Sequence, residues 1–258
     1  MPVCITGMHR SGTSMVANLL NLCGVYLGEE GDLMPPTNDN LNGYWENRKF
    51  SHLNDQILAK LGGTWDMPPP ATAGWVEQEA LTPLRAKAEM LMEDFHGREP
   101  WGWKDPRNSL TLPFWDEVVK MRFLLGLGSR LKLVICLRNP LEVFRSLRDR
   151  EHAPSAEGRH LWVKYSESAL NSSLPEDRIV THYESYFRDP RAELRRVLEF
   201  LKIPVSTDLI DRSISAISSS LRHQRLNEAV SEQTLDRKLV TLYRDLCREA
   251  NFIELSEN

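Results

Sequence analysis

Short runs of consecutive apolar residues alternate along this chain with longer stretches whose apolar residues recur every three or four positions. The short runs predict buried strands, which we expect at residues 3–6, 101–104, 131–137 and 178–183. The longer stretches predict amphipathic helices, which we expect at residues 15–23, 50–61, 82–96, 112–125, 140–150, 157–172, 191–201 and beyond 206. Strands that alternate with helices through short loops favour a three-layer α/β fold, in which a central parallel sheet has helices on both faces.

The loop between the first strand and the first helix has the pattern of an anion-binding loop. Gly7 and Gly12 bound it, and Thr13 and Ser14 follow at the start of the helix. Such a loop directs several backbone N–H groups and the positive end of the helix dipole at one point, where a phosphate or a sulfate can bind. Its spacing is similar to the phosphate loop G-x4-G-K-[ST], but Thr13 occupies the lysine position and the cation, Arg10, lies inside the loop.

Basic residues follow three of the predicted strands directly. They are Arg10, Lys104 and Arg138. The carboxyl ends of parallel strands lie at one edge of the sheet, so we expect these side chains near the same site. Pro140 begins a helix after Arg138, and Ser146 lies about two turns into it, facing back toward the strand end. Two anion sites, one at the glycine loop and one at Arg138 and Ser146, suit a nucleotide with phosphates at both ends.

The length of 258 residues allows one sizeable α/β domain. We expect residues 1–204 to form a P-loop-like core and residues 205–258 to form a helical C-terminal segment. Residues 62–76 are rich in Gly, Pro and Trp, and they predict an irregular loop. Its tryptophans either line a pocket or cover the core. A basic cluster with Arg222 and Arg225 is either a solvated surface or a ligand contact.

Composition narrows the class of protein. The chain is 41% hydrophobic and 26% charged, and its net charge of −4 argues against a general nucleic-acid binder. The four cysteines lack metal-ligand spacing, so we interpret them as free thiols of a reducing compartment. No apolar run approaches the ~18–20 residues of a membrane span, and the first strand starts too early to leave room for a signal peptide. These features predict a cytoplasmic protein.

Four motifs, in order along the chain, resemble those of sulfotransferases that use 3′-phosphoadenosine-5′-phosphosulfate (PAPS). Thr6–Ser14 is similar to the family's 5′-phosphosulfate loop, in which Lys or Arg precedes Ser-Gly-Thr. Arg138 and Ser146 resemble its 3′-phosphate motif. The other two are Trp103-Lys104-Asp105-Pro106, similar to the Lys-Asp-Pro of the tyrosylprotein branch, and Val180-Thr181-His182-Tyr183-Glu184 with Asp189-Pro190, similar to a Tyr-Glu…Asp-Pro segment. The matches run from residue 3 to about residue 204.

The resemblance implies a role for each matched position. Arg10 and the N–H groups of the next four residues, which are Ser11, Gly12, Thr13 and Ser14, would hold the 5′-phosphosulfate. Arg138 and Ser146 would hold the 3′-phosphate. Lys104 would bind the bridging oxygen, where negative charge grows as the S–O bond breaks. The product would be 3′-phosphoadenosine-5′-phosphate (PAP), and the resemblance implies no metal ion.

The base that takes the proton from the acceptor is less directly indicated. Small-molecule cytosolic members have a histidine shortly after the lysine, where this chain has Pro106, and this favours the carboxylate-base branches. Glu46 resembles the glutamate that begins a helix in heparan-type enzymes, whereas Glu29 and Glu30 resemble the tyrosylprotein base. We favour Glu46, because its aromatic neighbours could desolvate it and raise its pKa. The alternative is that Glu46 only complements the dipole of a helix.

The acceptor is not readable from the sequence. The carboxylate-base branches suggest a hydroxyl or amine acceptor, and we expect a carbohydrate or another small metabolite, with a peptide tyrosine as a further possibility. Two other functions remain open at this point. One is a P-loop kinase that phosphorylates a small metabolite with ATP-Mg²⁺, and the other is a nucleotide-binding module without turnover.

Overall fold

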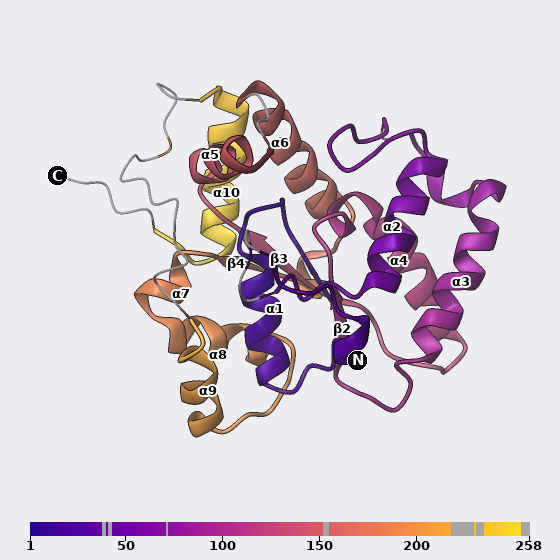
Figure 1. Ribbon diagram of the computed structural model, residues 1–258, viewed down its shortest axis with the longest axis horizontal. Helices are drawn as coiled ribbons and strands as arrows, with labels where there is room; N and C mark the ends of the chain where they lie inside the picture. The colour runs from indigo at the N-terminus through magenta and orange to yellow at the C-terminus, as the bar shows by residue number, and fades with distance from the viewer. Residues whose placement is uncertain are drawn as a thin grey trace.

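The centre of the molecule is a sheet of four parallel strands in the order β2-β1-β3-β4 (Figure 1). The strands are β1 (Pro2–Thr6), β2 (Trp101–Lys104), β3 (Lys132–Leu137) and β4 (Arg178–His182). Ile5 pairs with Lys104 on one side and with Val134 on the other, so the carboxyl ends of the strands reach the same edge. The computed structural model describes residues 1–37, 40, 43–70, 72–151, 155–217, 230 and 235–253.

Helices cover both faces of the sheet, as the sequence predicts. One face packs against α1 (Thr13–Leu22), α7 (Ser185–Arg188), α8 (Pro190–Phe200) and α9 (Thr207–Ile214). The other face packs against α2 (Arg48–Lys60), α3 (Thr82–Glu93), α4 (Asn108–Leu124), α5 (Pro140–Glu151), α6 (Ser155–Asn171) and α10 (Arg237–Glu249). Two separate groups of buried apolar side chains result, one on each side of the sheet.

Alternation along the central strand explains why there are two cores. Val3 and Ile5 of β1 enter the core beneath α1, α8 and α9, whereas Cys4 between them enters the core on the opposite face. All three side chains are fully buried. A strand with apolar residues at every position is therefore what this two-sided burial requires.

The start of α4 differs from the prediction. The apolar pattern predicts a helix from residue 112, but α4 begins at Asn108 and continues through Pro113. Asn108, Ser109 and Thr111 are polar and yet fully buried. The Asn108 Oδ1 accepts hydrogen bonds from Trp103 and from Asn54. Buried polar contacts therefore extend the helix by one turn, and a search for apolar periodicity cannot find that turn.

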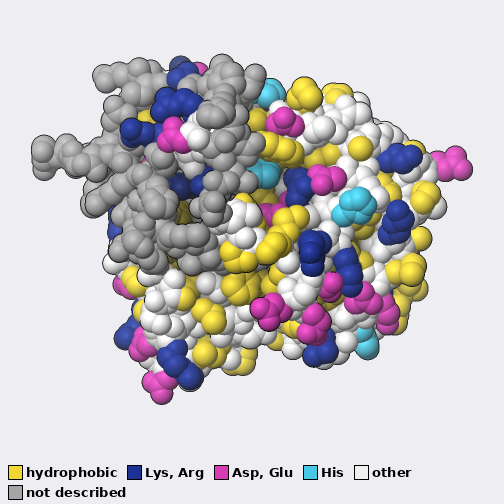
Figure 2. Space-filling view, in the orientation of Figure 1, with side chains coloured by type: hydrophobic (Ala, Val, Ile, Leu, Met, Phe, Trp, Pro, Cys, Tyr) yellow, Lys and Arg dark blue, Asp and Glu magenta, His cyan; other side chains and the backbone are white. Residues whose placement is uncertain are grey.

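The described part of the C-terminal segment is helical. It contains α9 and α10, and α10 packs against α6 and β4. Arg222 and Arg225, the predicted basic cluster, lie outside the described residues. Within the described part of the chain, no helix is both long enough and apolar enough to cross a membrane. On the described part of the face in Figure 2, basic and acidic side chains are interspersed.

Candidate active site

The loop after β1 lies tightly against the ends of its neighbouring strands. Gly7 has φ of 139° and Gly12 has φ of 84°, both in the region that favours glycine. A Cβ at Gly7 would lie 2.3 Å from the Cys136 carbonyl oxygen of β3, and a Cβ at Gly12 would lie 2.3 Å from the ring of Tyr183, just after β4. Among the described side chains, none caps the N-terminus of α1, which begins directly after Gly12. The glycines therefore hold the uncapped end of α1 at the carboxyl edge of the sheet.

The predicted donor-binding residues meet beside this loop. Arg10 Nε donates a hydrogen bond to Ser146 Oγ at 2.8 Å, and Arg138 Nη1 donates to the Arg10 carbonyl oxygen at 3.2 Å. Arg138 also lies 4.4 Å above the Tyr183 ring and donates from Nε to Glu142 Oε2 at 2.8 Å. The two predicted anion sites are therefore adjacent, since Arg10 of one contacts Ser146 of the other.

Lys104 joins the loop to the candidate base. Its side chain is 2% exposed, and Nζ donates to Glu46 Oε1 at 2.6 Å, to Ser14 Oγ at 3.2 Å and to the Tyr44 carbonyl oxygen at 3.1 Å. Ser14 lies in the first turn of α1. One ammonium group thus contacts both the N-terminus of the phosphate-loop helix and a buried carboxylate.

Glu46 lies just before α2 and does not cap that helix. The cap is Asn47, whose side chain accepts a hydrogen bond from the Lys49 N–H. Trp45, which has φ of 58°, turns the chain immediately before Glu46. Burial raises the pKa of Glu46; the charge of Lys104 opposes this rise but does not cancel it. Glu46 therefore lies outside the first turn of α2, and its carboxylate contacts Lys104.

The other two candidate bases lie elsewhere. Glu29 accepts a hydrogen bond from the Tyr26 hydroxyl group and pairs with Arg98, and its side chain is 69% exposed. Glu30 is exposed in the short 3₁₀ helix that follows. Of the three glutamates, the structure places Glu46 against Lys104.

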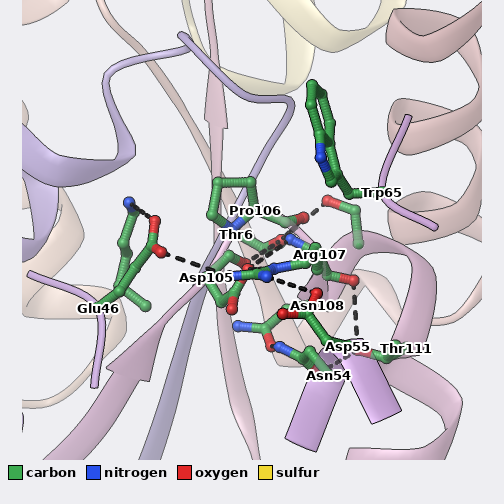
Figure 3. Close-up of polar contacts among 12 residues, drawn as sticks. Thr6, Glu46, Asn54, Asp55, Trp65, Asp105, Pro106, Arg107, Asn108 and Thr111 are labelled. Atoms are coloured by element: carbon green, nitrogen blue, oxygen red, sulfur yellow. Dashed lines mark hydrogen bonds and ion pairs between the residues drawn. The ribbon is translucent and has the colours of Figure 1, made fainter. Parts of the chain in front are cut away.

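Arg107 is a charged residue of this region that the sequence analysis missed. Its Nη2 lies 3.5 Å from Glu46 Oε2, its Nη1 lies 2.6 Å from Asp55 Oδ1, and its Nε donates to Asp105 Oδ1 at 2.9 Å (Figure 3). Burial alone would raise the pKa of Asp105, but the charge and hydrogen bonds of Arg107 outweigh it and lower that pKa. A signal was present, because Arg107 follows Lys104-Asp105-Pro106 at the end of β2.

The proline-rich loop reaches the phosphate loop through one of its tryptophans. The Trp65 ring lies 4.6 Å from the His9 ring, and the Tyr165 hydroxyl group donates to the Trp65 carbonyl oxygen at 2.8 Å. Trp65 is half-buried, whereas Trp75 packs against the core that contains α2, α3 and α4. The two tryptophans therefore lie in different places: Trp65 is beside the candidate site, and Trp75 covers the core.

Comparison with known families agrees with this geometry. The model of the Sulfotransferase family matches residues 2–207, which include every candidate site residue named above. The chain belongs to the sulfotransferase family. This membership confirms the family predicted from the four motifs, and with it the prediction that the protein is an enzyme that transfers a sulfuryl group. The roles of individual residues in this sulfotransferase stay predictions.

Solved structures share the fold of this sulfotransferase. The sulfotransferase domain from the curacin biosynthetic pathway is 14% identical, with a TM-score of 0.51 over 98% of this chain and 99% of that one. The sulfotransferase domain from the Synechococcus PCC 7002 olefin synthase is 18% identical, with a TM-score of 0.54 over 95% and 94%. Sulfotransferase STF9 from Mycobacterium avium is 15% identical, with a TM-score of 0.51 over 98% and 77%. No curated protein matches the chain.

Proposed function

We propose that the protein transfers the sulfuryl group of PAPS to a hydroxyl or amine group of a carbohydrate or another small metabolite. The observation that carries the proposal is the position of Lys104, whose Nζ contacts Ser14 of the phosphate-loop helix and the Glu46 carboxylate at once. Sulfuryl transfer needs a cation for the leaving oxygen of the donor and a base for the proton of the acceptor, and Lys104 and Glu46 would supply these two groups beside the phosphate loop.

The donor would bind along the two adjacent anion sites. The N–H groups of Ser11, Gly12, Thr13 and Ser14, together with Arg10, suit a 5′-phosphosulfate, since the N-terminus of α1 carries positive charge and no capping side chain among the described residues. Arg138 and Ser146 suit the 3′-phosphate. Glu142 and Tyr183 hold Arg138 in place, so that little side-chain entropy would be lost when a phosphate binds.

In the reaction, the acceptor oxygen or nitrogen attacks sulfur while the bond from sulfur to the bridging oxygen breaks. Glu46 accepts the proton that the acceptor loses, and its raised pKa suits this role, because a base acts best when its pKa lies near the working pH. Lys104 donates a hydrogen bond to the bridging oxygen, where charge accumulates. PAP leaves with that charge. Every step uses side chains of the chain itself, and none requires a metal ion.

Two features support the choice of acceptor and location. Trp65 presents a half-buried aromatic face beside the phosphate loop, and such a face suits the apolar side of a sugar or another ring. All four cysteines are buried and free of disulfides, which supports a reducing compartment such as the cytoplasm.

The test is sulfate transfer from radiolabelled PAPS to a panel of sugars, aminosugars and phenols, with PAP measured as the second product. We expect a labelled product from at least one sugar or aminosugar. Calorimetry separates the alternatives: we expect PAP to bind and ATP-Mg²⁺ to bind far more weakly. Tight binding of ATP-Mg²⁺ without PAP binding would indicate a kinase. PAP binding without a product from any acceptor would indicate a module that lacks turnover.

A further inference from the structure

The most densely paired cation near the candidate site is Arg107, which the proposed reaction does not yet use. Its side chain is 11% exposed and reaches three carboxylates that come from separate parts of the chain, namely Glu46, Asp55 and Asp105. Asp55 belongs to α2, Asp105 follows β2, and Glu46 lies in the segment before α2. A guanidinium group has five N–H donors in a fixed plane, so one side chain can hold all three groups in a fixed relation.

We propose that Arg107 is a positioning residue that holds the Glu46 carboxylate in its orientation and in its charged form while Lys104 serves the leaving group. This inference rests on the proposed function, because it assigns Arg107 a role toward the proposed base. It adds a residue that lies outside the four motifs.

The two carboxylate oxygens of Glu46 face different cations. Oε1 accepts from Lys104 at 2.6 Å, and Oε2 faces Arg107 at 3.5 Å. When Lys104 donates to the bridging oxygen of the donor, the Lys104 ammonium group is shared between that oxygen and the Glu46 carboxylate. Arg107 then remains as the cation beside Oε2, so the carboxylate does not become an unpaired buried charge. Oε1, which Lys104 then leaves, is the oxygen that accepts the proton of the acceptor.

The remaining contacts of Arg107 explain why it can serve as a fixed point. Its own backbone N–H and its Nε both donate to Asp105 Oδ1, at 2.8 and 2.9 Å, and Asp105 is fully buried. Its Nη1 is bound to Asp55 at 2.6 Å. Burial lowers the pKa of the Arg107 guanidinium, but the charge and hydrogen bond of Asp105, together with the charges of Glu46 and Asp55, outweigh burial and raise it, so the group stays protonated. Figure 3 shows the guanidinium between Asp105 and Glu46.

Removing the charge of Arg107 should change the pKa of Glu46 in a predictable direction. The charged groups that face Glu46 are Lys104 and Arg107, which lower its pKa, and Asp105, which raises it. Without Arg107, burial and Asp105 act against Lys104 alone, so the pKa of Glu46 rises further. A base must be deprotonated to act, and the acid limb of the kcat profile therefore moves to higher pH.

The experiment compares Arg107→Gln with Arg107→Lys and with Arg122→Gln in the full chain. Arg122 is a suitable control because it lies at the other end of α4, is 15% exposed and pairs with one carboxylate, that of Glu93. We expect Arg107→Gln to lower kcat about 10- to 100-fold, the range of effects that misplaced groups cause. We also expect its acid limb to move up by about one pH unit, a tenfold change in protonation. The Kd of PAP should stay within about twofold.

Arg107→Lys restores the charge without the planar fork, so we expect its acid limb to return toward that of the wild type while kcat stays reduced. Arg122→Gln should change neither quantity. The proposal is wrong if Arg107→Gln keeps both kcat and the acid limb, or if kcat and PAP binding fall together with no shift of the limb. If Arg107→Gln does not fold, Asp105→Asn/Arg107→Gln is compared with Asp105→Asn, because the charge of Asp105 itself raises the pKa of Glu46 and must be absent from both.

A measurement without turnover separates this inference from the proposed function. Carbon-13 NMR of labelled glutamate, assigned with Glu46→Gln, reports the titration of Glu46 directly. We expect Glu46 to titrate at higher pH in Arg107→Gln than in the wild type. A wild type that transfers no sulfate would contradict the proposed function, whereas an unchanged Glu46 titration would contradict the role of Arg107.

Discussion

The two sides of the candidate site use similar cations for different chemistry. On the donor side, Arg10 contacts the Ser146 hydroxyl group, and Arg138 contacts the Glu142 carboxylate and the Arg10 carbonyl oxygen. On the base side, two cations share three carboxylates, which are Glu46, Asp55 and Asp105. Arginines beside a glycine loop suit an anionic nucleotide, whereas a cluster of buried carboxylates suits the acceptance of a proton. Lys104 is the contact between the two sides.

The largest expected effect is a loss of kcat on the base side. Glu46→Gln should lower kcat by about 10²- to 10⁴-fold, the usual contribution of a positioned base, because the amide cannot accept the proton of the acceptor. The Kd of PAP should change by less than about twofold, since Glu46 does not contact the phosphate loop residues directly. Steady-state sulfate transfer and calorimetry with PAP measure the two quantities. Turnover equal to that of the wild type would remove Glu46 from the mechanism.

Lys104→Met should give the next largest loss, because it removes the contact between the two sides. We expect kcat to fall by a factor of about 10² to 10³, the loss that follows removal of one donor to a developing charge. Methionine keeps the apolar stem of the side chain, so that the packing within β2 changes little. Thermal unfolding serves as the control, since Glu46 keeps Arg107 as a partner in this variant. A loss of less than about threefold would show that Lys104 is structural.

The signals by which the sequence indicates the donor-side residues are local. Gly7, Gly12 and Arg10 lie within one turn between a strand and a helix, and Arg138 follows a buried strand directly. Each can be assigned from its neighbours along the chain. The four strands and the two-sided sheet are predictable for the same reason, because continuous apolar runs record burial on both faces.

The base side depends on contacts between distant parts of the chain. Arg107 meets Asp55 and Glu46, which lie 52 and 61 residues away. No local pattern records such a pair, and a resemblance indicates only the residues that its motif contains. Glu46 follows Trp45, which has a positive φ, so the direction of the Glu46 side chain cannot be deduced from the helix that follows. The early start of α4 has the same origin, since its first turn is buried through polar contacts.

Arg138→Ala tests the donor side with a smaller expected effect. Loss of a charge-assisted hydrogen bond to the 3′-phosphate should raise the Kd of PAP about 10- to 100-fold, which corresponds to about 1.5–3 kcal/mol. The Kd of 5′-AMP, which lacks the 3′-phosphate, should change by less than about twofold and is the internal control. Calorimetry with both nucleotides makes the comparison. Equal losses for the two would show that Arg138 supports the loop through the Arg10 carbonyl oxygen, and does not read the 3′-phosphate.

The smallest expected effect concerns acid: the stability of the donor side and the protonation of the base should depend on pH separately. His182 ends β4 beneath the donor side, and its ring is stacked 3.6 Å from the Phe252 ring. Burial, together with the charges of Arg188 and Arg138, lowers the pKa of His182 to about 3. The folded protein therefore keeps this ring neutral from its ordinary pKa of about 6.5 down to about 3, whereas the unfolded chain binds the proton. Stability is thus lost as the pH falls through this window, by at most about 1.4 kcal/mol per pH unit from this one group.

His182→Asn should make the free energy of unfolding depend less steeply on pH in that window, because the titrating ring is gone while an acceptor for the Glu184 N–H remains possible. Urea unfolding at a series of pH values measures the slope, which is informative even if the loss of stacking on Phe252 lowers stability at every pH. His160→Asn, which removes an exposed ring, is the control and should keep the wild-type slope. The acid limb of kcat should stay in place in His182→Asn, since it belongs to Glu46. If that limb moved with the stability curve, the loss of activity in acid would reflect unfolding of the donor side and not protonation of the base.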